Sequence, residues 1–223
     1  MTRELEIAQN LAKVRERIAK AAASSDRNLE EITLIAVTKN FPVSDAQILY
    51  ELGIRDMGEN RDEEGARKSE QLPADIAWHF QGQIQSRKIK SIASWADVVQ
   101  SLDSLSHAEK FAALVEEKPM EFFLQINLEP EREDRGGIAP DALEEFLDLL
   151  KVKTEIVPIG LMTVAPIDQD PTHSFLELAQ LGKVAKVERL SMGMSGDFET
   201  AIAAGATHIR VGSSILGSRG YRA

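Results

Sequence analysis

Lys39 is the residue whose position in the sequence most clearly suggests chemistry. It follows the apolar run 32–37, which is typical of a buried strand. Side chains alternate along a strand, so Lys39 shares a face with Ile35 and Val37. An amine at the mouth of an apolar strand is partly desolvated, which lowers its pKa and favours a Schiff base with an aldehyde. Taken alone, the simpler interpretation is a lysine whose chain extends to water.

Two segments of small residues could hold an anion. Residues 191–196 read SMGMSG and precede a predicted helix, and residues 212–214 read GSS and also precede a helix. A helix start after small residues presents backbone N–H groups and the positive end of the helix dipole. Ser195 could add a hydroxyl. The alternative is ordinary turn chemistry.

Arg210 is the third candidate, because its place in a strand points it inward. Arg210 and His208 have the opposite parity to Ile209 and Val211, so they face the interior if those two apolar residues face helices. A buried arginine needs an acceptor, either in a structural ion pair or on the ring of a ligand. A lysine, an anion cradle and an inward arginine together suit a phosphorylated ring that carries an aldehyde.

The elements that must position these residues alternate regularly. A helix over 2–25 is predicted from Ile7, Leu11, Val14 and Ile18. Eight strand–helix pairs follow, with strands at 32–37, 54–57, 76–80, 98–102, 121–126, 156–162, 187–191 and 207–211. The helices lie at 43–52, up to about 72, 86–93, 104–117, 140–150, 171–184, 196–204 and from 213 onward. Strict alternation predicts an α/β fold, a (β/α)8 TIM-type barrel with an extra N-terminal helix, as a single domain over 1–223. In such barrels the carboxyl ends of the strands carry the site, and the loops after strands 7 and 8 often hold phosphate.

Composition excludes several classes of protein. The 223 residues carry a formal net charge of −10, which argues against nucleic acid or an anionic membrane as the main partner. The absence of cysteine excludes disulfides, thiolate nucleophiles, zinc–thiolate sites and iron–sulfur clusters. No signal peptide or membrane-spanning run is visible in the sequence. We therefore expect a cytoplasmic protein and a monomer.

Other residues with chemical potential favour structural interpretations. Asp168 and Asp170 flank Gln169 and could suggest a metal, but such a pair more often caps the following helix, and no metal site is predicted. Packing is the better interpretation of His79. His107 and His173 open helical stretches and are expected to be exposed, and the run 129–137 is expected to be a solvated loop. Core or rim packing is expected of four methionines: Met57, Met162, Met192 and Met194.

An ordered set of motifs covers residues from about 30 to 219. Its members are 34–39 (LIAVTK), 58–60 (GEN), 78–80 (WHF), 85–86 (QS), 160–162 (GLM), 190–195 (LSMGMS) and 210–212 (RVG). This set resembles the pyridoxal-phosphate homeostasis protein family, which is similar to the N-terminal barrel domain of alanine racemase standing alone. The resemblance implies that Lys39 carries pyridoxal 5′-phosphate (PLP) as an internal aldimine. It also implies that Ser195, Gly212 and Ser213 hold the phosphate and that Arg210 faces the pyridine nitrogen. Asn60 is implied near the ring hydroxyl, and Met192, in the most specific string, completes the implied cofactor-binding set.

Binding without turnover is the function that the residues favour. PLP enzymes usually place a carboxylate at the pyridine nitrogen, whereas an arginine favours an unprotonated nitrogen and weakens carbanion stabilisation. Racemisation also needs a second acid/base, and neither tyrosine, Tyr50 nor Tyr221, is well placed by sequence. We therefore predict no catalytic residues and a role in vitamin B6 homeostasis, with PLP-dependent apo-enzymes as possible recipients. The alternatives are a weak amino-acid racemase, a Schiff-base aldolase and a purely structural barrel.

Overall fold

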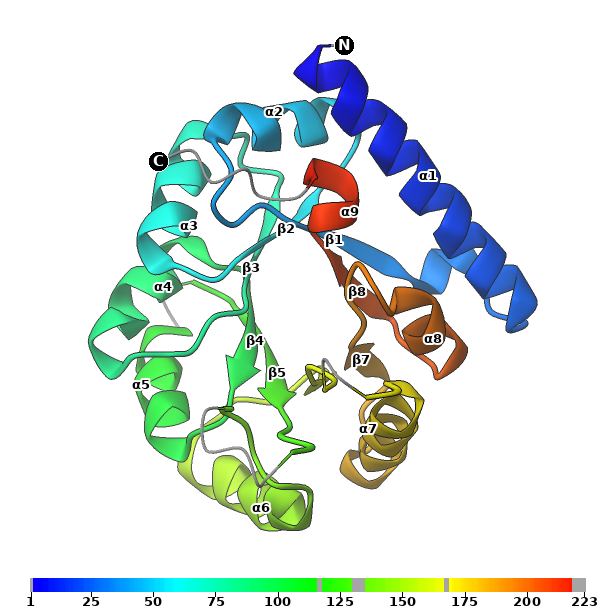
Figure 1. Cartoon of the computed structure of the whole chain (residues 1–223). Helices are drawn as coiled ribbons and strands as arrows, with labels where there is room; N and C mark the ends of the chain where they lie inside the picture. The colour runs from blue at the N-terminus through cyan, green and yellow to red at the C-terminus, as the bar shows by residue number, and fades with distance from the viewer. Residues whose placement is uncertain (1, 116–117, 130–134, 167–168, 218–223) are drawn as a thin grey trace.

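The protein is a closed barrel of eight parallel strands, as predicted. We describe it from a computed structural model, which covers residues 2–115, 118–129, 135–166 and 169–217. The strands pair in sequence order and β8 pairs with β1, which closes the barrel (Figure 1). They are β1 (Thr33–Val37), β2 (Asp56–Glu59), β3 (Ala77–Phe80), β4 (Val98–Leu102), β5 (Glu121–Gln125), β6 (Gly160–Met162), β7 (Arg189–Ser191) and β8 (His208–Val211).

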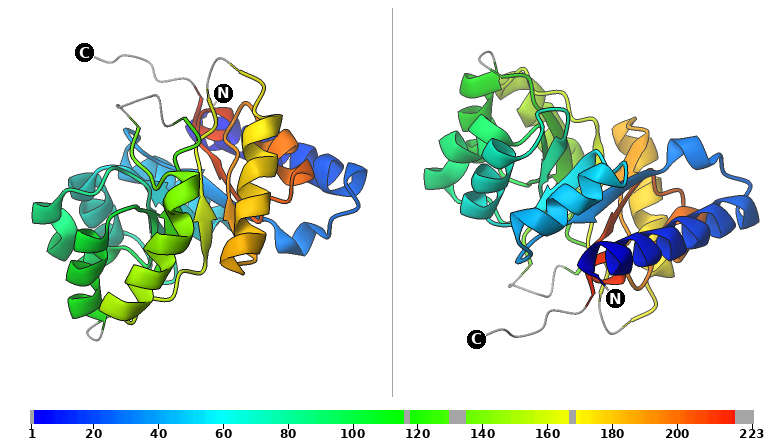
Figure 2. Two further views of the ribbon diagram at one scale, coloured as in Figure 1. Left: turned by 90° about the horizontal axis from the view of Figure 1, so that it is seen from below. Right: turned by 90° about the horizontal axis from the view of Figure 1, so that it is seen from above.

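Helices surround the barrel on its outer side (Figures 1 and 2). They are α1 (Arg3–Ser24), α2 (Val43–Glu51), α3 (Asp62–Gln71), α4 (Ile89–Trp95), α5 (Leu105–Val115), α6 (Leu143–Lys153), α7 (Thr172–Ala185), α8 (Phe198–Ala203) and α9 (Ser213–Leu216). Within the described ranges, none of these helices is long and apolar enough to cross a membrane.

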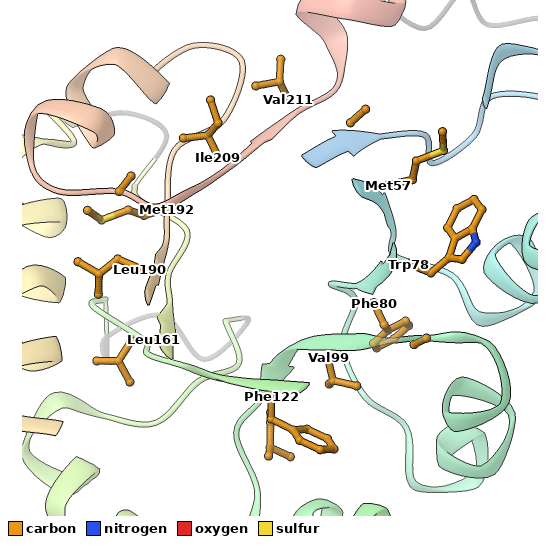
Figure 3. Close-up of a cluster of buried hydrophobic side chains, with 14 of the residues drawn as sticks. Met57, Trp78, Phe80, Val99, Phe122, Leu161, Leu190, Met192, Ile209 and Val211 are labelled. Carbon is orange, nitrogen blue, oxygen red and sulfur yellow. The ribbon is translucent and has the colours of Figure 1, made fainter. Parts of the chain in front are cut away.

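Alternating side chains divide the core into two layers. The outward-facing residues of the strands pack against the helices, and Figure 3 labels several of them, among them Trp78, Phe122 and Ile209. Val98, Phe123 and Met162 form a separate cluster from the opposite faces of their strands, inside the barrel. Strands β4, β5 and β6 are therefore buried on both faces, as expected for a parallel sheet closed on itself.

The extra helix α1 covers the seam at which the barrel closes. Its apolar stripe from Ile7 to Ala22 is buried, and the helix contacts α2, α8 and α9. The last helix, α9, has four residues, so it covers little of the sheet by itself. Asn10 Nδ2 donates to Ile215 O at 3.1 Å and Arg3 donates to Leu216 O at 2.9 Å. In this way α1 fixes the short helix that begins at the barrel rim (Figure 1).

Two predicted strands are displaced in the structure. Strand 54–57 is found at Asp56–Glu59, because Ile54 N bonds to Leu49 O and belongs to the end of α2, where Gly53 has φ 86°. Strand 156–162 shortens to Gly160–Met162, because Val157 is 81% exposed and Pro158 has no N–H to donate to a neighbour.

The remaining elements agree with their predicted ranges to within about three residues. The end of the predicted helix 104–117 and much of the predicted loop 129–137 lie outside the described residues. That residues 1–223 form a single domain stays a prediction.

Candidate functional site

Lys39 lies in a tight turn directly beyond the end of β1. Thr38 N pairs with Gly58 O at 3.0 Å, and Phe41 N donates to Thr38 O at 3.0 Å, which closes the turn. Asn40 has φ 64°, a left-handed conformation that asparagine tolerates better than most residues. The Lys39 side chain is half-buried and lines a pocket at the carboxyl ends of the strands, together with Val37.

The two segments of small residues meet on the other side of the same pocket. Ser195 Oγ accepts from Gly212 N and from Ser214 N, both at 3.2 Å, and Ser214 Oγ donates to Ser195 O at 3.3 Å. Asp197 Oδ1 accepts from Met194 N at 2.5 Å and fixes the loop after β7. Backbone amides from the start of α9 therefore converge on one small acceptor, which is the arrangement that also binds an anion.

Arg210 lies on β8 and points into the barrel, as predicted. Its guanidinium donates to Ser191 Oγ and to Thr163 O, both at 2.7 Å. Burial lowers its pKa to about 10, and the charge of Asp197 opposes this shift. In the described part of the chain, no carboxylate pairs directly with Arg210. A cation without a paired carboxylate thus lies at the base of the pocket and can face a neutral acceptor atom of a ligand.

The pocket brings together six of the seven residues that the sequence singled out. It has a volume of about 620 Å³, within the range of roughly 300–1,000 Å³ for small-molecule sites. The six that line it are Lys39, Asn60, Ser195, Arg210, Gly212 and Ser213. Met192 is different: its side chain is fully buried in the outer core layer, as Figure 3 shows. Met194 lines the pocket instead, because Gly193 between the two methionines has φ 90° and breaks the alternation that would put both on one face.

Sequence reasoning missed some lining residues. Phe41, Gln81, Gln83 and Val164 also line the pocket. Gln81 directly follows β3 as Thr38 follows β1, and its amide packs against Gly58, where a Cβ would lie 2.5 Å from Gln81 Nε2. The common signal is position: each of these residues lies just beyond the carboxyl end of a strand, where the site of a (β/α)8 barrel is built.

A buried ion pair beneath Lys39 was also missed. Lys68 on α3 and Glu59 on β2 are fully buried, and Lys68 Nζ lies 2.5 Å from Glu59 Oε1. The sequence assigned this part of α3 to a polar helix, and a lysine in such a helix usually faces water. Two charged side chains at 0% exposure must be paired, because an unpaired buried charge is far too costly.

The weaker candidates have structural roles or lie away from the pocket. His79 is buried inside the barrel, 3.1 Å from Asp56 Oδ1 and 3.0 Å from Gln100 Nε2. Asp170 accepts from the backbone N of Thr172, the first residue of α7, at 2.9 Å, whereas Asp168 lies outside the described residues. No cluster of potential metal ligands occurs in the part of the chain that the structure covers.

The other histidines and the tyrosines are also accounted for. The side chain of His173 is 91% exposed, as expected, whereas His107 is half-buried and lies 3.2 Å from Ser86 Oγ. The Tyr50 ring on α2 stacks under Arg55, outside the pocket, and Tyr221 lies outside the described residues.

Comparisons with known proteins agree with this geometry. A family model described as "Alanine racemase, N-terminal domain" matches residues 6–220. A pyridoxal phosphate homeostasis protein of Mycobacterium leprae (strain TN) is 34% identical over 241 residues, which cover 96% of this chain and 93% of that protein.

Solved structures of similar fold cover the chain almost completely. The structure of PipY from Synechococcus elongatus with PLP bound has a TM-score of 0.80 and 32% identity, over 95% of this chain and 100% of that one. The crystal structure of an unknown protein from Bifidobacterium adolescentis has a TM-score of 0.88 and 28% identity, over 96% of this chain and 95% of that one.

Proposed function

This chain belongs to the family of the alanine racemase N-terminal domain and, within it, to the pyridoxal phosphate homeostasis proteins; we propose from this that its pocket binds PLP. The solved structure of PipY, to which this chain is similar, has PLP bound. The observation that supports this proposal is geometric: Lys39 and the amides around Ser195 line the same pocket from the ends of different strands. An aldehyde and a phosphate on one small molecule match these two features.

The residues present fit PLP in further respects. Asn60 Oδ1 is buried and has no hydrogen-bond partner among the described residues, so it can accept from a ligand hydroxyl. Gly212 has no side chain, so its backbone can approach a ligand closely, and a Cβ there would lie 3.2 Å from Val37 O. Arg210 offers a buried donor that no carboxylate of the described residues pairs with.

Each part of the pocket then has a role toward the group. The Lys39 amine would hold the aldehyde carbon, and Ser195, Gly212 and Ser213 would hold the phosphate. Arg210 would face the pyridine nitrogen and Asn60 the ring hydroxyl. When bound, the group supplies an aldehyde that condenses with an amine with loss of water. The chain itself supplies the amine, the anion cradle and the walls that orient the ring.

Little or no turnover is the second part of the proposal. The curated relatives are named for homeostasis, although the family model takes its name from an enzyme domain. Arg210 is always charged and keeps the ring nitrogen unprotonated, which weakens the electron sink that racemisation needs. Tyr50 does not line the pocket, so it cannot provide a second acid/base there. Weak racemase or aldolase activity is the alternative, and Lys39 would be essential to either.

A homeostasis protein must release as well as hold its ligand. We propose PLP-dependent apo-enzymes as recipients and a monomer in the cytoplasm as the working form. The net charge of −10 supports small-molecule and protein partners rather than nucleic acid.

The test is to trap the ligand on its lysine. Purified full-length protein is mixed with PLP, its absorbance is recorded, and borohydride then reduces the C=N bond to a stable secondary amine. We expect a visible absorbance band that borohydride removes, and mass spectrometry should find the adduct on the peptide that contains Lys39. An adduct confined to other lysines, or no band at all, overturns the assignment. Conversion of L-alanine to D-alanine by the loaded protein would instead favour the racemase alternative.

A further inference from the structure

Lys68 is a fully buried lysine that the proposed function does not use. It projects from α3, and its Nζ donates to Glu59 Oε1 at 2.5 Å and to Thr38 O at 2.7 Å. Glu59 Oε1 also accepts from Thr38 Oγ1 at 2.6 Å. The three side chains thus form one buried network that ends on Thr38, the residue before Lys39.

Stability alone does not account for this network. Removing two charges from water is costly, and a pair of apolar residues of similar volume often serves a fold as well or better. Burial raises the pKa of the Glu59 carboxyl, although the attraction of Lys68 opposes the shift. Glu59 Oε2 has no hydrogen-bond partner in the described part of the chain. The pair is therefore best understood by what it holds in place.

What the network holds is the backbone on one side of Lys39. All three polar groups of Thr38 are engaged: its N donates to Gly58 O, its hydroxyl to Glu59, and its carbonyl accepts from Lys68 and from Phe41 N. The Thr38 peptide therefore cannot rotate without leaving a buried charge or carbonyl unsatisfied, which is costly.

The backbone on the other side of Lys39 is also bound to α3. Asn40 N donates to Glu64 Oε2 at 2.7 Å, and Asn40 holds the left-handed conformation that turns the chain toward α2. Residues before and after Lys39 are thus fixed by side chains of one helix, Lys68 and Glu64. The cradle does not depend on these contacts, because its hydrogen bonds come from Ser195 and α9.

We infer that the buried Glu59–Lys68 pair is a positioning device that orients the Lys39 amine for covalent attachment of PLP. The inference rests on the proposed role of Lys39. In the attachment, the amine adds to the aldehyde carbon, a C=N bond replaces C=O, and the oxygen leaves as water. The rate of such a step depends steeply on the placement of the reacting atoms, and a displacement of about 1 Å can cost roughly a hundredfold.

The experiment compares PLP with pyridoxine 5′-phosphate, which has the same ring and phosphate but an alcohol in place of the aldehyde. The proteins are the full-length chain and two variants, Lys68→Met and the double variant Glu59→Gln/Lys68→Met. The double variant leaves no unpaired buried charge and should fold. Stopped-flow absorbance gives the rate of PLP attachment, and calorimetry gives the affinity for pyridoxine 5′-phosphate. We expect attachment to slow about tenfold or more in both variants, with the affinity for pyridoxine 5′-phosphate within twofold of wild type.

Asp62→Asn is the matched control. Asp62 is a buried carboxylate on the same helix, but it accepts from Ser91 Oγ at 2.7 Å and Trp95 Nε1 at 3.1 Å, toward α4. Both of these partners belong to α4 and neither belongs to the turn around Lys39, so attachment should proceed at the wild-type rate.

The outcomes separate the two proposals. A double variant that attaches PLP at the wild-type rate overturns the positioning role and leaves the proposed function intact. Equal losses of PLP attachment and pyridoxine 5′-phosphate affinity also overturn it, because they indicate general support of the fold. A wild-type chain that forms no adduct overturns the proposed function and the positioning role together.

Discussion

Polar side chains occupy the barrel interior in two regions, and they are satisfied in different ways. At the rim, Lys39, Asn60 and Arg210 line an open pocket. Toward the opposite, amino-terminal ends of the strands, a cluster of Asp56, His79, Gln100 and His208 lies away from this pocket. We call this second group the inner cluster.

The inner cluster is bonded largely within itself. His79 has Asp56 at one ring nitrogen and Gln100 at the other, and His208 bonds to the neighbouring Thr207 hydroxyl at 2.8 Å. Residue type alone therefore does not distinguish a binding group from a packing group. What distinguishes them is whether their polar atoms converge on one another or on an open pocket. Changes at the rim should therefore alter ligand binding, and changes in the inner cluster should alter stability.

The largest expected effect is at the rim. Lys39→Ala removes the amine that the proposal bonds to PLP, so the visible absorbance band and the borohydride adduct should disappear. Pyridoxine 5′-phosphate, which needs no amine, should still bind with an affinity within a few-fold of wild type. The control is Lys90→Ala, which removes an exposed lysine on α4 and should leave the band unchanged. An absorbance band that persists in Lys39→Ala would show that Lys39 is not the residue that bonds to PLP.

The next effect belongs to the inner cluster and depends on pH. Burial lowers the pKa of His208 from 6.5 to about 4. The unfolded chain therefore binds a proton that the folded chain does not, and His208 makes the protein less stable as pH falls from about 6.5 toward 4. By pH 5 this amounts to about 2 kcal/mol.

His208→Asn should remove this part of the pH dependence. Urea unfolding of the variant and the wild type between pH 5 and 7.5 measures it, and the difference between the two profiles isolates His208 from the carboxylates. PLP attachment at pH 7.5 should change little. Parallel stability profiles would show that His208 is not buried in its neutral form.

A smaller effect is expected in the phosphate cradle. Gly212→Ala places a methyl group 3.2 Å from Val37 O, so the chain must shift where the amides converge. The loss of about one charge-assisted hydrogen bond corresponds to roughly a tenfold weaker affinity. PLP and pyridoxine 5′-phosphate should weaken alike, whereas unphosphorylated pyridoxal should not. Gly182→Ala on α7 is the matched control, because a Cβ there would make a similarly tight contact, 3.0 Å from Leu190 Cδ2, but Gly182 does not line the pocket. If the two glycine variants bind PLP with equal affinity, the phosphate does not lie at the amide of Gly212.

The smallest effect concerns the support of the cradle from outside the barrel. Asn10→Ala removes the hydrogen bond from α1 to Ile215 O on α9, which should cost about 1 kcal/mol of stability. The affinity for the phosphorylated ligands, PLP and pyridoxine 5′-phosphate, should fall by a few-fold at most. Arg15→Ala removes a comparable bond, from the same helix to Leu52 O at 3.1 Å, and should leave phosphate affinity unchanged. If both variants bind alike, α1 does not support the cradle.

Much of the fold could be predicted, because the alternation of buried strands and amphipathic helices repeats eight times. The wrong strand boundaries occur where apolar residues next to a strand belong to a helix end or a connecting segment. Ile54 is 5% exposed and reads as strand, but its amide closes the end of α2. Pro158 interrupts what reads as one strand, and β6 begins after it.

The candidate site could be predicted where position along a strand settles it. Lys39, Ser195 and Arg210 all follow from strand ends and parity. The Glu59–Lys68 pair could not be predicted, because nine residues separate its members on two different elements and a charged helix usually faces solvent. Met192 packs in the outer core and Met194 lines the pocket. The motif 190–195 contains both residues, and its sequence alone does not show which of them contacts the ligand.

In the proposed complex, opposite sides of one pocket hold the two ends of the same PLP molecule. A crystal structure of the protein grown with PLP tests this most directly. We predict continuous density from Lys39 Nζ to the aldehyde carbon, with the phosphate against Ser195 and the amides of Gly212 and Ser213. Density that joins PLP to another lysine, or a phosphate that lies away from these amides, would contradict the account.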